Sequence, residues 1–217
     1  MSLAQRAYDI IREEILNCTL APGQQIVQAR LVEKYGLGLT PIREALQRLA
    51  HEGLVQPYPR FGYIVSPVTE EMVRHLYEVR MILEAAAVRL AVERASDAQL
   101  RQVAENARFT YIYKNHEQYV RFLERNAAFH DSIAMLAGNP RLAEVLGGLL
   151  DELSRIFHLG LDLRDSAEEM QSEHTALAEA LLARDADRAG RVMREQITRS
   201  QQRVLEALRH GQELYKN

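Results

Sequence analysis

The sequence predicts a mainly α-helical protein of two domains. Residues 1–67 are expected to form three helices and a β-hairpin, and residues 68–217 an all-α bundle of six helices. Two observations indicate this division. All prolines but Pro140 lie in the first 67 residues, where they separate short segments, and long amphipathic stretches follow. With 47% hydrophobic residues among 217, the chain has enough apolar surface for folded domains of this size.

Composition excludes several classes of protein. No apolar run is long enough to cross a membrane, and the N-terminus lacks a hydrophobic signal core, so we expect a cytoplasmic protein. The lone Cys18 excludes an internal disulfide and a cysteine-based zinc finger. The net charge is −3; residues 1–67 hold seven Lys/Arg and six Asp/Glu, a net of +1, and the remainder holds 20 and 24, a net of −4. A nucleic-acid partner must therefore be argued from pattern, because the charge does not indicate one.

In the N-terminal part, apolar spacing predicts a first helix from about Ala4 to Asn17 and a second from Gln28 to Tyr35. A third helix is expected to begin at Thr40 as N-cap, with Pro41 at its first helical position, and to stop before Gly53. Its buried side would consist of Ile42, Ala45, Leu46 and Leu49. Two short extended runs, residues 55–58 and 63–65, then predict a hairpin.

This order of elements is that of a winged helix-turn-helix. The third helix would turn Thr40 and Gln47 outward, with Arg43 and Arg48 on its flanks, as a helix in the DNA major groove requires. In the hairpin, Gly62 permits a close backbone approach, and Arg60 beside it adds attraction in the minor groove. Protein-interaction modules share this layout, however, and in such a module the two helix arginines would be solvated or paired with nearby glutamates.

Four segments of this part resemble the GntR family of bacterial transcription regulators: residues 31–36 (LVEKYG), 40–49 (TPIREALQRL), 52–55 (EGLV) and 60–65 (RFGYIV). The resemblance implies that Thr40, Arg43 and the wing around Gly62 contact operator DNA. One position departs from the family pattern, because the usual arginine before the threonine is Leu39 here. The operator preference is therefore expected to differ, with a larger part for Arg30 or Arg48.

Six helices are predicted after Pro67. Their starts and stops follow from capping residues. The first runs from Thr69 to about Arg94, Ser96 opens the second with a capping box, the third covers about Glu117 to Ala137, Asn139-Pro140 opens the fourth, Asp165 or Ser166 caps the fifth, and Asp185 caps the sixth.

Polar residues gather on the apolar sides of these helices. Asn126 and His130 lie one turn apart, His174 lies among apolar neighbours on the fifth helix, and Gln196 and Ser200 lie on the sixth. Buried polar groups cost about 1–3 kcal/mol each unless they are paired, so such a cluster indicates an effector site. A single inward histidine is more often an ordinary core residue. Arg80 on the first helix could bind a carboxylate effector, although a buried ion pair with an acidic neighbour is favoured.

The second region resembles the FadR subfamily, specifically its FCD-type effector domain. The resemblance rests on residues 77–84 (YEVRMILE), 129–130 (FH), 138–140 (GNP), 173–174 (EH) and 183–187 (ARDAD). The resemblance implies a metal site, because in many such domains an Asp and three His bind a divalent metal. The metal then helps to hold a small carboxylate effector. Here His130 and His174 match two of the histidines, while Asn126 and Gln196 replace the Asp and the third His. Because these replacements are neutral, we expect metal-free binding of the effector ahead of a zinc or nickel site on His130 and His174.

These observations predict a ligand-responsive transcription regulator, in which a homodimer binds a pseudo-palindromic operator and an organic-acid effector releases repression. The chain has no nucleophile elbow, phosphate-binding glycine loop or cysteine nucleophile paired with a base, so an enzyme is not expected. The alternative is a helical small-molecule or metal-binding protein, or an enzyme, with a vestigial DNA-binding domain.

Overall fold

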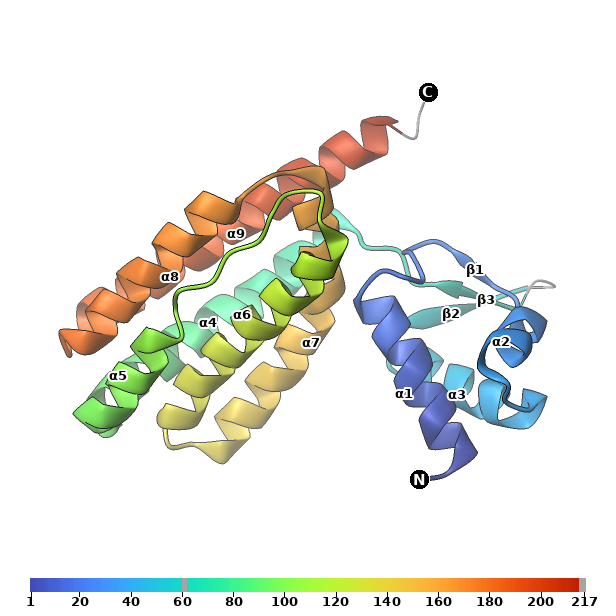
Figure 1. The fold of residues 1–217 in the computed structure, drawn as a ribbon, viewed down its shortest axis with the longest axis horizontal. Helices are drawn as coiled ribbons and strands as arrows, with labels where there is room; N and C mark the ends of the chain where they lie inside the picture. Colours follow the sequence, from blue (N-terminus) through green and yellow to red (C-terminus); the bar gives the residue numbers. More distant parts are fainter. Residues whose placement is uncertain (60–61, 215–217) are drawn as a thin grey trace. The chain divides into compact units, whose positions relative to one another are not determined.

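In the computed structural model, which describes residues 1–59 and 62–214, the chain divides into two compact units, Met1–Thr69 and Glu70–Asn217. The expected boundary, after residue 67, lies two residues earlier. Within the described residues the fold is mainly helical, as predicted, with a small three-stranded sheet in the first unit (Figure 1).

The described part of the first unit contains three helices: α1 (Leu3–Leu16), α2 (Gln28–Tyr35) and α3 (Leu39–His51). Strands β2 (Val55–Tyr58) and β3 (Gly62–Val65) form the predicted hairpin, in which Val55 pairs with Val65 and Tyr58 with Gly62. A further strand, β1 (Gln25–Ile26), was not predicted; it pairs antiparallel with the other edge of β3. The sheet order is therefore β1-β3-β2. Strand β1, which precedes α2, pairs with the edge of the β2–β3 hairpin that lies opposite β2.

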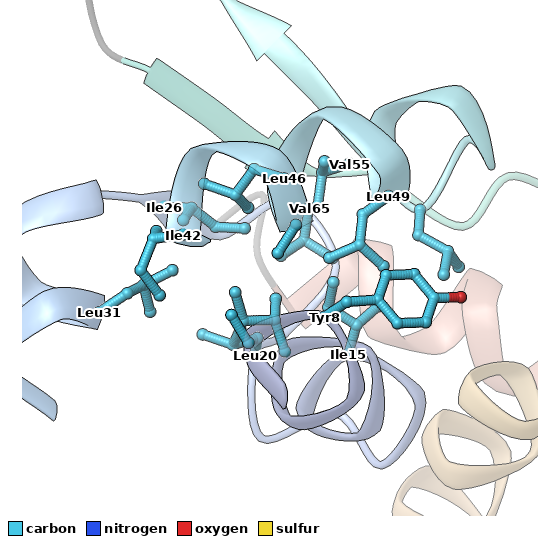
Figure 2. Close-up of a cluster of buried hydrophobic side chains, with 14 of the residues drawn as sticks. Tyr8, Ile15, Leu20, Ile26, Leu31, Ile42, Leu46, Leu49, Val55 and Val65 are labelled. Atoms are coloured by element: carbon cyan, nitrogen blue, oxygen red, sulfur yellow. The ribbon is translucent and has the colours of Figure 1, made fainter. Parts of the chain in front are cut away.

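One side of each helix of the first unit faces a common apolar core. Figure 2 shows α1 contributing Tyr8 and Ile15, α3 contributing Ile42, Leu46 and Leu49, and the strands contributing smaller β-branched residues. Ile15, Ile42, Leu46 and Leu49 have no exposed surface. Burial of a Leu or Ile side chain stabilises a fold by roughly 1.5–3 kcal/mol, so this core fixes the face of α3 that remains exposed.

Over residues 70–214, which the structure describes, the second unit is the predicted bundle of six helices. They are α4 (Glu70–Arg94), α5 (Asp97–Glu105), α6 (His116–Leu136), α7 (Pro140–Leu163), α8 (Ala167–Leu182) and α9 (Ala186–Leu214). Helix α4 packs against α6, α7 and α9, and α8 lies along α9. Residues 106–115 return along the bundle as a largely irregular segment before α6 begins (Figure 1).

Capping explains most of the helix boundaries. The Ser96 hydroxyl accepts a hydrogen bond from the Gln99 backbone while Gln99 bonds back, which completes the predicted capping box. Asn139 and Asp185 also accept hydrogen bonds from the first turns of α7 and α9. Ser166 is the N-cap of α8 without a side-chain cap bond, and the Asp165 carboxylate accepts from the Ala167 backbone instead.

The predicted start of α3 was wrong. The helix begins at Leu39 with Gly38 as its N-cap, so Thr40 lies inside the first turn and Pro41 follows it. Gly38 adopts the extended conformation of an N-cap (φ −67°, ψ 163°), for which glycine is well suited. Proline is still accommodated, because the first-turn amides of a helix have no intrahelical acceptor. No helix among the described residues is long and apolar enough to cross a membrane.

Candidate functional site

The exposed face of α3 carries the side chains that were expected to read DNA. Thr40, Arg43 and Gln47 are all exposed, opposite the buried residues of the same helix. Their spacing of three and four residues puts them on one side of α3. This side is a row of hydrogen-bonding groups on a helix that the core holds rigidly.

Arg43 is hydrogen-bonded to a neighbouring helix. The Nε of Arg43 donates to the side-chain oxygen of Gln28 at 3.2 Å, and Gln28 is the first residue of α2. The bond uses one of five guanidinium N–H groups, so the forked end of Arg43 remains available for a base or a phosphate. Sequence reasoning missed Gln28, because its partner is 15 residues away in the chain.

The structure places Arg48 differently. Its guanidinium lies over the Tyr8 ring, with the guanidinium carbon 3.6 Å from the ring centre. It also donates to Gln5 at 2.9 Å and to Glu52 at 3.2 Å, and the Tyr8 hydroxyl donates to the same Glu52 carboxylate. These contacts connect two side chains of α1 with Arg48 of α3 and with Glu52, the C-cap of α3. This geometry favours a structural role for Arg48.

The remaining expected DNA contacts lie at the edges of this face. Arg30 is exposed in the first turn of α2, and Leu39 is 42% exposed at the first residue of α3. Gly62 has φ +93°, and a Cβ there would lie 3.2 Å from the carbonyl oxygen of Ile26. Only glycine fits this conformation beside β1 without strain. Arg60 lies outside the described residues.

The bundle contains a small polar cavity between α4, α6, α7, α8 and α9. It has a volume of about 10 Å³, the space of about one water molecule, and the polar residues on its wall include four of the six expected for an effector. These four are Arg80, Asn126, Gln196 and Ser200. His130 and His174 are buried nearby but are not lining residues, and their rings lie 5.7 Å apart.

A chain of ionic contacts extends from the cavity into the core. Arg80 Nε donates to Glu84 at 2.5 Å, and the other Glu84 oxygen lies 2.5 Å from His130 Nδ1. Burial raises the pKa of Glu84, but the charge of Arg80 and the hydrogen bonds from Arg80 and His130 outweigh it and lower the pKa to about 2. Because Glu84 is therefore ionised and can only accept, His130 carries its proton on Nδ1 and directs Nε2 away from Glu84. The buried ion pair favoured for Arg80 is present.

His174 is fully buried among aromatic rings. Phe109 and Phe129 lie 4.7 and 5.2 Å from it, between ring centres. Burial, together with the electrostatic effects of the neighbouring His130 and Arg80, holds the pKa of His174 well below its usual range, so the ring is neutral. Both ring nitrogens of His174 are buried without a hydrogen-bond partner among the described residues. The same is true of His130 Nε2 and of Gln196 Oε1.

These unpartnered atoms allow a test of the family's metal site. Metal-binding histidines normally donate their second ring nitrogen to an acceptor, which His130 does toward Glu84 and His174 does not. Asn126 and Gln196 supply neutral amides, and Glu84 is already paired with Arg80. No group of three or more His, Cys, Asp or Glu in the described part of the chain could hold a metal ion. The residues present do not fit the zinc or nickel site of the family.

Sequence reasoning missed an ion pair on the wall of the cavity. Arg203 donates from both terminal nitrogens to the two oxygens of Glu173, each at 2.7 Å. The side chains are 11% and 5% exposed. A signal for Arg203 existed, since it follows Gln196 and Ser200 at helical spacing on the same face of α9. Tyr77 was also missed; its hydroxyl lies 2.8 Å from that of Ser200.

Comparison with known proteins gives consistent matches for both units. A sequence model described as "Bacterial regulatory proteins, gntR family" matches residues 3–65, and one described as "FCD domain" matches residues 75–199. The repressor RspR of Escherichia coli is 26% identical over 89% of this chain and 85% of its own. The repressor GlaR of the same species is 27% identical over 88% of this chain and 90% of its own.

Solved structures show the same fold. Escherichia coli McbR/YncC superposes with a TM-score of 0.75 at 24% identity, covering 95% of this chain and 98% of its own. A putative GntR regulator from Rhodococcus sp. RHA1 has a TM-score of 0.76 at 21% identity, covering 95% and 99%. These matches do not favour a binding protein or enzyme with a vestigial DNA-binding domain. The chain belongs to the GntR family of bacterial transcription regulators and, within it, to the FadR-like subfamily with a C-terminal FCD domain.

Proposed function

We propose that this regulator acts as a homodimeric repressor on a pseudo-palindromic operator, and that a small organic acid bound in the helical bundle releases it. The observation that carries the DNA-binding part is the exposed row of Thr40, Arg43 and Gln47 on α3, which is held by a rigid core. In a dimer, each α3 enters the major groove of one half-site. Two relatives named as repressors support the sign of the effect.

Each residue of this surface has a distinct role in the proposal. Arg43, oriented by Gln28, forks onto a guanine edge or a phosphate, while Thr40 and Gln47 bond to neighbouring bases. Leu39 offers an apolar contact to a thymine methyl group at the position where the family pattern has arginine. Gly62 brings the wing backbone close to the minor groove, where Arg60 adds its charge, and Arg30 holds a phosphate.

The effector is held by hydrogen bonds and ion pairs of the cavity, without a metal. Supporting this are the polar groups Arg80, Asn126, Gln196 and Ser200 on its wall. The two buried histidines beside it have nitrogens without partners among the described residues. Since the cavity holds about one water, the effector must open it, and this movement couples the bundle to the DNA-binding domains. Such coupling is typically ~1–3 kcal/mol, a change in DNA affinity of about 5- to 150-fold.

Fluorescence anisotropy tests the DNA-binding part. A labelled fragment from upstream of the protein's own gene is titrated with wild type, Arg43→Ala and Arg101→Ala at two salt concentrations, against a scrambled fragment. We expect Arg43→Ala to lose about 1–3 kcal/mol of specific binding, roughly 5- to 150-fold in affinity. Arg101, exposed on α5 of the other unit, is the matched arginine control and should leave affinity unchanged. Equal binding of the two fragments by wild type, or an unchanged Arg43→Ala, contradicts the proposal.

Two further measurements test the effector part. Metal analysis of protein purified without a His-tag should find no stoichiometric zinc or nickel. His174→Ala should weaken the response of DNA binding to effector while it leaves DNA affinity itself intact. A His174→Ala variant that fails to fold would instead identify His174 as an ordinary core residue.

A further inference from the structure

The Glu173–Arg203 ion pair separates the buried cavity from an open groove. Both residues line the cavity, and both also line a groove of about 520 Å³ on the surface of α8 and α9. Polar and charged side chains, among them Arg164, Glu169 and Arg199, form the rest of the groove wall. A molecule that enters the cavity from this groove meets the ion pair first.

The charges around the cavity are already balanced. Arg80 is neutralised by Glu84, and Arg203 by Glu173, so two guanidinium groups face two carboxylates. A buried charge without a partner is costly. An anionic ligand can therefore enter at low cost only if one of the two internal carboxylates leaves.

The two carboxylates differ in their freedom to leave. Glu84 is 1% exposed and is held by both Arg80 and His130 deep in the bundle. Glu173 lies beside the groove, and both of its carboxylate oxygens accept hydrogen bonds from Arg203. A rotation of its side chain is enough to return its own carboxylate to water, and Arg203 stays paired if an incoming carboxylate takes the place of Glu173.

We propose that a carboxylate of the effector replaces the carboxylate of Glu173 on Arg203, so that Arg203 is the residue that selects carboxylate effectors. This inference rests on the proposed function and names the contact that the effector makes. The forked geometry of the observed pair, with two bonds of 2.7 Å, is the one that a free carboxylate adopts on arginine. Glu173 is then an internal competitor that keeps the cavity closed until an external carboxylate is abundant.

A neighbouring carboxylate does not play this part. Glu169 reaches Arg203 at 3.4 Å, but Arg164 holds both of its oxygens, at 3.0 and 2.9 Å. Its side chain is 48% exposed, so it contributes to the groove and not to the cavity wall. Glu169 therefore provides a matched control for Glu173, with the same chemistry one helical turn away.

Acetate is a suitable probe, because it reproduces the end of a glutamate side chain. The full chain is titrated with sodium acetate at constant ionic strength, and the Tm of its helical signal is followed by circular dichroism, with acetamide as the uncharged analogue. Wild type should show a saturable rise of Tm with acetate and none with acetamide. Glu173→Ala, which vacates the site on Arg203, should lower the apparent Kd for acetate at least tenfold, whereas Glu169→Ala should not change it. Arg203→Met should abolish the response, and Arg203→Lys keeps the charge if the methionine variant does not fold.

An ion pair with a purely structural role gives a different result. Acetate would then stabilise Glu173→Ala by filling the vacated space but would not bind wild type, and this outcome overturns the proposal. An acetate response in Arg203→Met equal to that of wild type also overturns it. DNA anisotropy with acetate distinguishes a failure of the carboxylate exchange on Arg203 from a failure of the proposed function. If acetate binds as expected but DNA affinity does not change, the exchange stands and the organic-acid effector fails; if DNA affinity responds while Glu173→Ala and wild type bind acetate equally, the exchange fails alone.

Discussion

The buried Glu84 carboxylate provides the most quantitative test of how the bundle is held together. Glu84→Gln keeps the shape of the side chain but removes the charge that faces both Arg80 and His130. A folded-state pKa of about 2 against the usual value of 4.5 corresponds to roughly 3 kcal/mol in favour of the ionised, folded form at neutral pH. Removing one partner of a buried ion pair typically costs about 3–5 kcal/mol. Both routes predict that Glu84→Gln lowers the free energy of unfolding by about 3 kcal/mol.

Urea unfolding followed by far-ultraviolet circular dichroism measures this loss, since the chain has no tryptophan and the signal comes from the helices. The control is Glu117→Gln, which removes the glutamate of an ion pair with Arg121 on the surface of α6. Those two side chains are 77% and 71% exposed, so we expect a loss of no more than about 1 kcal/mol. The double replacement Arg80→Met/Glu84→Leu should lose less than Glu84→Gln, because it leaves no unpaired charge.

The pH dependence of the free energy of unfolding tests the sign of the Glu84 contribution. A depressed carboxylate pKa stabilises the fold above about pH 4.5, and this stabilisation is lost as the pH falls toward 2. The difference between wild type and Glu84→Gln should therefore be largest near neutral pH and should shrink in acid. A loss below about 1 kcal/mol at pH 7, or a double replacement as unstable as Glu84→Gln, would refute this account.

Three further perturbations follow from the structure. Gly62→Ala should destabilise the wing by about 1–3 kcal/mol and weaken operator binding, because φ is +93° there and the new Cβ meets the Ile26 carbonyl; anisotropy and thermal unfolding would measure both. Leu39→Arg should increase the slope of log affinity against log salt by about one if the new side chain reaches a phosphate; an unchanged slope would exclude that contact. Burial and the charge of His116 lower the pKa of His158 to about 4, so stability falls as pH drops below 6.5. His158→Gln should remove about 2 kcal/mol of the loss between pH 7 and 5, and an unchanged pH profile would rule out this role.

Local patterns in the sequence predicted most elements of the fold. The capping box at Ser96 and the Asn139-Pro140 start depend on side chains within three residues of the helix end, so they can be read directly from the chain. The first helix was displaced by one residue, an ordinary uncertainty at helix ends. The two-residue strand β1 could not be predicted, because it is defined by its pairing with β3, whose partner residues follow 37 and 39 positions later, and not by a periodicity of its own.

The candidate sites divide in the same way. Burial of Asn126, His130, His174 and Gln196 follows from helical periodicity and was predicted. Which of them form a cavity depends on how α4, α6, α7, α8 and α9 pack, and that packing separates the histidines from the lining. The pairing of Arg203 with Glu173 joins residues 30 positions apart on different helices. The contact between the Arg48 guanidinium and the Tyr8 ring joins residues that are even farther apart in sequence, so helical periodicity could not predict it either.

The incompletely satisfied core of the bundle has a consequence for the lifetime of the protein in a cell. His174 and Gln196 carry atoms that find no partner among the described residues, so the bundle is less stable than its packing alone would make it. A ligand that binds only the folded state raises the population that proteases cannot attack. The amount of regulator should therefore rise while its effector is present. When the effector is exhausted, the cell holds a larger stock of protein, and a regulator that acts as the proposed repressor would reoccupy its operator faster than new synthesis would allow.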